Sequence, residues 1–183
     1  LIFATKDGLM KKTTLESYSR PRANGIIALG LREGDRLIRV TLTDGNSQML
    51  VASYNGKVVR FPEDTVRPMG RTATGVRAIK LDEDGQDRVI GMICVEEGSK
   101  ESVLVISEKG FGKRTDLDDE NGEAIYRITN RGGKGVKTMN LTDKTGNLIG
   151  LEAVTDEQDL MLITKSGTAI RMAMDTIRVM GRA

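Results

Sequence analysis

The sequence predicts an all-β protein of propeller-like architecture, and three observations support this prediction. A twelve-residue segment occurs four times along the chain. Each occurrence has the short apolar runs and the turn glycine of a β-hairpin, and the occurrences lie about 50 residues apart, which is the size of a propeller blade. No convincing helical period lies between them, so we expect little helix.

The repeated segment consists of an apolar run, a Ser or Thr, a glycine three residues later and a basic residue four residues after that. It spans Leu1–Lys12, Met49–Arg60, Val103–Arg114 and Leu160–Arg171. The glycines end the pairs Asp7-Gly8, Asn55-Gly56, Lys109-Gly110 and Ser166-Gly167. Such pairs favour two-residue hairpin connections that need positive φ. The flanking runs are rich in Val, Ile and Leu and are too short for helices.

Two further elements follow each of the first three hairpins, so each repeat supplies about four strands. The first element begins at a glycine and spans Gly25–Leu29, Gly75–Ile79 and Gly135–Met139. The second element spans Arg36–Val40, Arg88–Met92 and Asn147–Leu151. The loops that connect the two elements are acidic and contain glycine. The predicted unit is therefore a four-stranded blade.

This spacing predicts a single repeat domain over residues 1–183, with repeats at approximately 1–48, 49–101, 102–159 and 160–183. The fourth repeat is truncated, because Ile177–Arg182 echoes Val66–Arg71 and the sequence ends before a counterpart of Gly75. We therefore expect a partial assembly of about 3.5 to 4 blades, whereas a closed ring needs more. Leu1 is no natural start, so we also expect the chain to be a fragment.

The composition excludes several kinds of active site. The sequence has no histidine, which removes the commonest general base and the commonest transition-metal ligand. Its single cysteine, Cys94, lies in the apolar run Val89–Val95 and is expected to be a buried, inert thiol. The apolar runs are too short to cross a membrane. We expect no catalytic residue, no metal site and no cofactor in this chain.

Basic residues recur at equivalent places in the repeats, although the net charge is only +2. The position that ends each hairpin, with the residue before it, supplies Lys11, Lys12, Arg60, Lys113, Arg114 and Arg171. A second group precedes the next strand and comprises Arg20, Arg22, Arg67, Arg71, Arg127, Arg131, Lys134, Arg178 and Arg182. Acidic residues cluster elsewhere, in 33–35, 82–87, 96–101, 116–123 and 156–159.

Equivalent positions in stacked repeats form a line, so these bases would form a positive stripe along one edge. Such a stripe suits the backbone of duplex DNA, because phosphates attract Lys and Arg without regard to sequence. The alternative interpretation is that the charges only protect exposed strand edges from pairing. Segregation of the two signs across the repeats favours the stripe.

Four segments of the repeats are distinctive, namely GLMKKT at Gly8–Thr13, SRPRANGIIAL at Ser19–Leu29, VRPMGRTATGVRAI at Val66–Ile79 and GFGKRT at Gly110–Thr115. They closely resemble the C-terminal repeats of the DNA gyrase A protein and its topoisomerase IV relatives. The resemblance covers essentially the whole chain. It implies a β-pinwheel, which is a propeller-like disc of about six blades whose neighbouring repeats exchange strands. The basic rim of that disc bends duplex DNA around itself.

One departure concerns the seven-residue box Gln-Arg-Arg-Gly-Gly-Lys/Arg-Gly that gyrases carry in the first blade. The nearest match is TNRGGKG at Thr129–Gly135, which keeps the last five residues and lacks the leading Gln-Arg. It also falls in the third repeat. We interpret it as a degenerate relative of the box and expect any full box to lie upstream of Leu1.

The resemblance implies a non-catalytic module that wraps duplex DNA in support of ATP-dependent negative supercoiling by a bacterial gyrase. The equivalent domain of the topoisomerase IV A protein is the alternative, and a protein-interaction propeller is the rival from another class. The expected partners are double-stranded DNA, the topoisomerase core of the same chain and an ATPase subunit of the gyrase B type. ATP and Mg²⁺ would bind other parts of that enzyme. The expected location is the bacterial cytoplasm, in association with the nucleoid.

Overall fold

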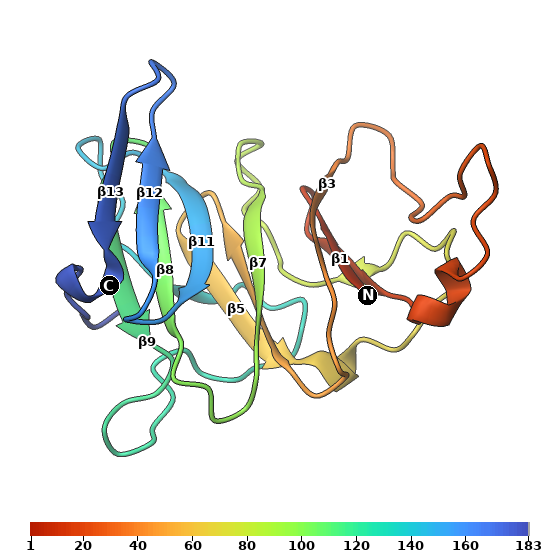
Figure 1. Cartoon of the computed structure of the whole chain (residues 1–183), viewed down its shortest axis with the longest axis horizontal. Coiled ribbons are helices and arrows are strands. Elements are labelled where there is room, and N and C mark those ends of the chain that lie inside the picture. Colours follow the sequence, from red (N-terminus) through yellow and green to blue (C-terminus); the bar gives the residue numbers. More distant parts are fainter. Residues whose placement is uncertain (183) are drawn as a thin grey trace.

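The computed structural model describes residues 1–182, and these residues form thirteen β-strands in four antiparallel sheets. Short 3₁₀ turns are the only helical elements within that range, so no described helix is long enough to cross a membrane. Figure 1 shows the sheets side by side in chain order, from β1 and β3 near the N-terminus to β12 and β13 near the C-terminus. The prediction of an all-β, propeller-like fold is confirmed.

Each sheet is built on one predicted hairpin. The hairpins are β1 (Ile2–Thr5) with β2 (Leu9–Lys12), β4 (Gln48–Ser53) with β5 (Lys57–Pro62), β8 (Ser102–Ser107) with β9 (Gly112–Asp116), and β12 (Asp159–Ile163) with β13 (Ala169–Ala173). Outer strands pair with the first strand of the first three hairpins, and they are β3 (Leu37–Thr41), β7 (Val89–Val95) and β11 (Leu148–Val154). The 3₁₀ turns are η1 (Leu15–Tyr18), η2 (Glu63–Thr65) and η3 (Met174–Thr176).

The remaining two strands cross from one repeat into the sheet of the preceding repeat. β6 (Val76–Arg77) follows the second hairpin along the chain but pairs with β2, and β10 (Val136–Lys137) follows the third hairpin but pairs with β5. The first two sheets therefore have the orders β3-β1-β2-β6 and β10-β5-β4-β7. Neighbouring repeats exchange strands, as the resemblance implied.

This exchange also explains a wrong prediction. Gly25–Leu29 was expected to form a strand equivalent to β6 and β10, but these residues have no strand structure. The equivalent segments β6 and β10 pair with the hairpin of the preceding repeat, whereas Gly25–Leu29 pairs with no described strand. Without a partner strand, the segment has no ladder of main-chain hydrogen bonds to join.

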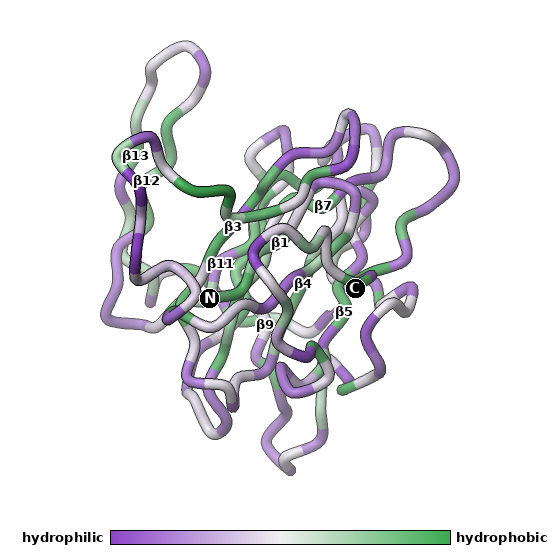
Figure 2. Tube along the Cα trace, turned by 90° about the vertical axis from the view of Figure 1, so that its right-hand side faces the viewer, coloured by the Kyte–Doolittle hydropathy of each residue, from purple (hydrophilic) through white to green (hydrophobic). Residues whose placement is uncertain are grey.

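The core lies between the stacked sheets and follows the alternation of side chains along each strand. On β4, Met49 and Val51 pack in the cluster between the first and second sheets, whereas Leu50 and Ala52 pack in the cluster between the second and third. A smaller cluster, which includes Leu104, lies between the third and fourth sheets. Figure 2 shows the apolar segments concentrated in the strands and the polar ones in the loops. Each fully buried aliphatic side chain stabilises the fold by about 1.5–3 kcal/mol.

The hairpin turns place glycine at equivalent points, but they are longer than predicted. Gly8, Gly56, Gly110 and Gly167 have φ values of 84°, 83°, 80° and 85°. In the first two turns the glycine amide donates to the Thr5 or Ser53 carbonyl oxygen, over 3.1 and 3.0 Å. Two residues therefore lie between the carbonyl group and the glycine amide that it binds. The glycine itself is left-handed, as in three-residue connections. The prediction of two-residue connections is wrong, because only the glycine adopts positive φ.

A second glycine position lets the exchanged strand approach the preceding hairpin. Gly75 and Gly135 have φ values of 101° and 73° and precede β6 and β10. A Cβ at Gly75 would lie 2.4 Å from the Met10 carbonyl oxygen, and one at Gly135 would lie 2.5 Å from the Val58 carbonyl oxygen. Both oxygens belong to main chain held in a sheet. Glycine at this position is therefore required for the exchange.

We predict that Gly135→Ala destabilises the protein more than Gly122→Ala. Both glycines are left-handed, with φ of 73° and 80°, so both alanines carry about 1–2 kcal/mol of backbone strain. Nothing lies within 4 Å of a Cβ at Gly122, whereas the Gly135 variant also collides with the Val58 carbonyl and loses about 1–3 kcal/mol more. Urea unfolding measures the difference, and equal losses in the two variants would contradict this role of Gly135.

Cys94 lies on β7, and its thiol is 3.5 Å from the Met49 sulfur. Burial raises the pKa of the Cys94 thiol to about 12, and the nearby Glu63 carboxylate acts in the same direction. The thiol is therefore protonated at neutral pH. The residue is half-buried and not fully buried as predicted, but its thiol packs against the core.

At pH 8 we expect iodoacetamide to alkylate Cys94 at least ~100-fold more slowly in the folded protein than in guanidinium chloride, because the thiolate is the reactive form. Mass spectrometry of the labelled protein gives both rates. A Cys94→Ala, Ser166→Cys variant is the control, since Ser166 is exposed in the fourth hairpin turn. Labelling of Cys94 as fast as the control cysteine would contradict its burial.

Candidate nucleic-acid interface

The arginines that end the second and third hairpins are buried. The side chains of Arg60 and Arg114 are 8% and 5% exposed. Arg60 Nη1 donates to Asp118 Oδ1 over 2.9 Å, and Arg114 Nη2 lies 2.8 Å from Asp156 Oδ1. Both guanidinium groups thus bind partners within the protein, although Arg60 Nε has no hydrogen-bond partner among the described residues. Their predicted contact with phosphate does not fit this placement.

The equivalent residues in the outer repeats are less enclosed. Lys12 Nζ lies 3.5 Å from Glu63 Oε1 and its side chain is 16% exposed. Arg171 is 70% exposed and forms an ion pair with Asp159 across its own hairpin. An exposed pair of this kind contributes about 0–1 kcal/mol, so Arg171 remains accessible to an anion.

Lys11 and Lys113, which precede these bases, bind main-chain carbonyl groups. Lys11 is fully buried, and its ammonium donates to the Arg71 carbonyl oxygen over 2.5 Å and to that of Ala28 over 2.6 Å. Lys113 donates to the Gly181 carbonyl oxygen over 2.8 Å. Desolvation lowers the pKa of both lysines. The predicted role of Lys11 in DNA contact does not fit this position, because its ammonium is buried, whereas Lys113 is half-buried and its hydrogen bond lies at the surface.

Three arginines of the second group occupy one repeat position and are half-buried. Arg71, Arg131 and Arg182 each donate from Nη1 to a main-chain carbonyl oxygen of the preceding repeat, over 2.9, 3.4 and 3.4 Å. The acceptors are the carbonyl oxygens of Ile27, Arg77 and Lys137, in that order. Arg131 belongs to the TNRGGKG segment. Each of these side chains joins two repeats while part of its guanidinium stays near the surface.

The exposed bases of the second group are the ones that remain available to a ligand. Arg67, Arg127 and Arg178 are exposed, and none of them has an ion pair or a side-chain hydrogen bond within residues 1–182. Each precedes a residue that forms a parallel bridge to the end of a hairpin, and the bridges are Lys12 with Pro68, Arg60 with Ile128 and Arg114 with Val179. The three arginines therefore occupy equivalent positions on the same edge of successive sheets. We call this set the exposed arginine series.

Other predicted bases are also exposed and unpaired within the described range, namely Arg20, Arg22 and Lys134. Two further bases were missed. Arg77 and Lys137 are exposed at equivalent positions on the exchanged strands β6 and β10. Each lies two residues after the glycine of its repeat, and this spacing could have revealed them.

The acidic residues are less segregated from the bases than predicted. Asp118 and Asp156 belong to two of the predicted acidic clusters, yet they form ion pairs with Arg60 and Arg114. The sequence could not show this, because 58 and 42 residues separate the partners along the chain. Acids therefore neutralise the buried bases and leave the exposed arginine series without a counter-charge.

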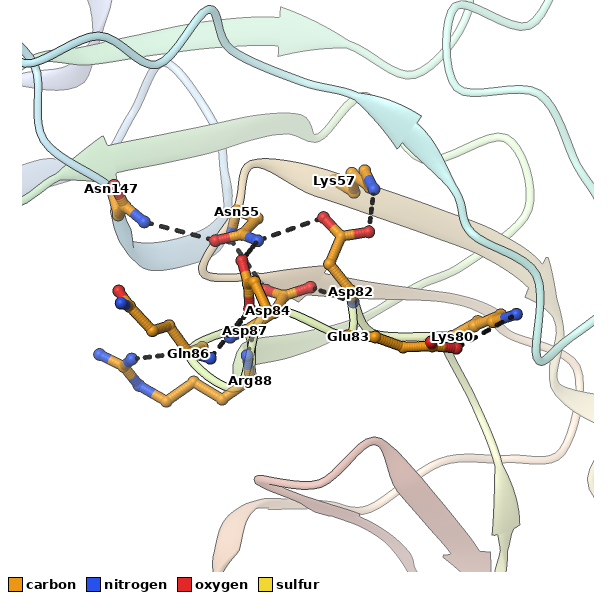
Figure 3. Close-up of polar contacts among 10 residues, drawn as sticks. All are labelled: Asn55, Lys57, Lys80, Asp82, Glu83, Asp84, Gln86, Asp87, Arg88 and Asn147. Atoms are coloured by element: carbon orange, nitrogen blue, oxygen red, sulfur yellow. Dashed lines mark hydrogen bonds and ion pairs between the residues drawn. The ribbon is translucent and has the colours of Figure 1, made fainter.

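Another acidic segment lies at the opposite, turn end of the second hairpin, and Figure 3 shows it gathered around Asn55. The Asn55 side-chain amide donates to Asp82 Oδ2 and Asp84 Oδ2, over 3.2 and 2.6 Å, and its main-chain amide donates to Asp87 Oδ1 over 3.0 Å. A hydrogen bond from Lys57 lowers the pKa of Asp82. These carboxylates stabilise the turn, and no group of described His, Cys, Asp or Glu residues is arranged to hold a metal ion.

The three tyrosines use their hydroxyl groups in contacts within the protein. Tyr18 donates to the Ala28 carbonyl oxygen over 2.9 Å, Tyr54 donates to Glu108 Oε1 over 2.7 Å, and the buried Tyr126 shares a 2.5 Å hydrogen bond with Thr138 Oγ1. Burial raises the pKa of Tyr126, and the Glu108 carboxylate raises that of Tyr54. These contacts give the tyrosines structural roles.

Stacked sheets that carry unpaired arginines at equivalent positions define a propeller-like repeat module with a basic edge. The family described as DNA gyrase C-terminal domain, beta-propeller, matches the chain at residues 1–44, 48–96, 101–155 and 158–183. The chain belongs to this family.

Two comparisons support this assignment. The chain is 45% identical to the DNA gyrase A protein of Staphylococcus aureus over all 183 of its residues, and it spans 20% of that protein. Its fold is similar to the C-terminal domain of DNA topoisomerase IV, with a TM-score of 0.87 at 24% identity, over 99% of this chain and 54% of that one. It is also similar to the DNA gyrase A C-terminal domain, with a TM-score of 0.82 at 21% identity, over 99% of this chain and 57% of that one.

Proposed function

We propose that this chain is a DNA-binding module of a bacterial gyrase A protein, and that it holds duplex DNA along the edge that carries the exposed arginine series. The main support for this proposal is the placement of Arg67, Arg127 and Arg178. They occupy one position in three successive repeats, and no acidic side chain of the described residues pairs with them. A regular row of free cations fits a ligand with a regular row of anions.

Phosphate contacts suffice for this role. Arginine binds phosphate oxygens in a bidentate manner, and each contact releases condensed counterions from the DNA. The arginines lie beside the strand ends, and no described recognition helix carries side chains into a groove. Binding is therefore independent of base sequence. A duplex that follows the arginine-bearing edge from one sheet to the next bends with that edge, and this bend is the contribution of the module to supercoiling.

The 45% identity to a gyrase A protein over the whole of this chain supports gyrase as the parent enzyme. The parent enzyme would be a type II topoisomerase in which the core of the same chain cleaves DNA and a gyrase B-type subunit hydrolyses ATP with Mg²⁺. This module would supply the DNA path and no catalytic residue. Its cellular location would be the bacterial cytoplasm, at the nucleoid.

Replacement of Arg67, Arg127 and Arg178 by alanine is expected to weaken binding to a duplex of arbitrary sequence. The slope of log K against log salt should become shallower by about 2.7, which corresponds to about 0.9 per lost phosphate contact. Fluorescence anisotropy between 50 and 200 mM salt, about the range in which such binding changes strongly, gives the slope.

The matched control replaces Arg32, Lys80 and Lys144, which are exposed and lie outside the repeated positions. It removes the same charge and should change the slope much less. Equal losses in the two triple variants would mean that only diffuse charge attracts DNA. Weak, salt-insensitive binding by the unmodified chain would instead favour a protein-interaction propeller.

A further inference from the structure

The base at the end of each hairpin reaches the following repeat. Lys12 Nζ donates to the Glu63 carbonyl oxygen over 3.2 Å, Arg60 Nη1 to that of Leu117 over 3.3 Å, and Arg114 Nη1 to that of Met174 over 2.8 Å. The three acceptors are equivalent, because each lies three residues after the corresponding base of its own repeat. One contact is thus made three times between successive sheets.

Further contacts strengthen these junctions. A carboxylate of the next repeat pairs with Lys12 and with Arg60, namely Glu63 and Asp118, whereas Arg114 pairs with Asp156 of its own repeat. The carbonyl oxygen of the base also accepts a hydrogen bond from the next repeat, from the amides of Met69, Thr129 and Met180 over 2.7, 2.8 and 2.8 Å. Side chain and main chain of one residue therefore bind the same neighbouring repeat.

Strand alternation explains why the base points toward the next sheet. Side chains two residues apart lie on the same face of a strand, so Arg60 shares the face of Val58. Val58 packs in the cluster between the second and third sheets, and Arg60 crosses the same gap at its rim. The main chain of Arg60 is held in β5, and its buried guanidinium is bound to the next repeat. The length of this side chain therefore limits how far the two sheets can separate.

Arg171 ends the fourth hairpin, its side chain is 70% exposed, and its partner is Asp159 of the same hairpin. The carbonyl acceptors of Lys12, Arg60 and Arg114 all belong to the following repeat, so the enclosure of these three side chains depends on that repeat.

We propose that Lys12, Arg60 and Arg114 are positioning residues that fix the angle between successive sheets. They do not bind phosphate. Through this angle they set the curvature of the edge that carries the exposed arginine series, and this consequence rests on the proposed function. The fixed angle itself is a property of the protein without DNA.

The test uses Arg60→Met and Arg114→Met in this chain. Loss of the hydrogen bonds from the buried guanidinium is expected to lower the melting temperature by about 5 °C, because the carboxylate partners are exposed and stay hydrated. Spin labels at Glu33→Cys and Ser166→Cys, in a Cys94→Ala background, report the distance between the first and fourth repeats by electron–electron resonance. We expect each Met variant to broaden that distance distribution. Arg60→Lys should restore a narrow distribution, because lysine makes the same contact at Lys12.

DNA binding provides the second measurement. The salt slope of the Met variants should stay within the error of the unmodified chain, whereas loss of a phosphate contact would flatten it by about 0.9. Arg32→Met is the control and should change neither the distances nor the melting temperature, because Arg32 is exposed and unpaired within the described residues.

A flattened slope with unchanged stability would overturn the proposal in favour of a phosphate contact. A lower melting temperature with an unchanged, narrow distance distribution would also overturn it, because the contact would then add stability without setting the angle. If the unmodified chain fails to bind DNA, the proposed function fails, while the distances still decide whether these residues position the sheets.

Discussion

The first three hairpins each bind the main chain of the next repeat, and this contact determines how the sheets are arranged. A hairpin alone is marginal in water, and it becomes stable when further strands complete its sheet and another sheet covers its face. Here the following repeat supplies both, since β6 joins β2 and β10 joins β5. Gly75 and Gly135 cannot be replaced by a residue with a side chain, because the crossing chain passes too close to a sheet carbonyl group.

This constraint divides the basic residues into two sets with different physical roles. Bases that face the next sheet, such as Arg60, become buried and satisfy its carbonyl and carboxylate groups. Bases on the crossing segment, such as Arg67, are exposed and remain unpaired in the described range. An ion pair in the first set holds the repeats together, and a free cation in the second set is available to phosphate. The net charge does not show this division, because a buried base and an exposed base contribute equally to it.

The hairpins could be predicted because they depend on local residues. Alternating apolar side chains and a glycine at a tight turn determine a hairpin within about a dozen residues. The partners of Arg60 and of Val76 could not be predicted, since they lie in other repeats, and repeat spacing alone does not show which sheet a segment joins. The sequence pattern therefore identified bases that recur in the repeats and misjudged the exposure of Lys11, Arg60 and Arg114. Exposure depends on what the next repeat places over a residue.

Arginine modification by phenylglyoxal, read by mass spectrometry with and without saturating duplex DNA, tests the division of the bases most directly. In the free chain, Arg67, Arg127 and Arg178 should react and Arg60 and Arg114 should not, because only the first three are exposed. DNA should protect those three and leave the two buried arginines as unreactive as before. Reaction of Arg60 and Arg114 in the free chain, with protection by DNA of these two alone, would contradict the account.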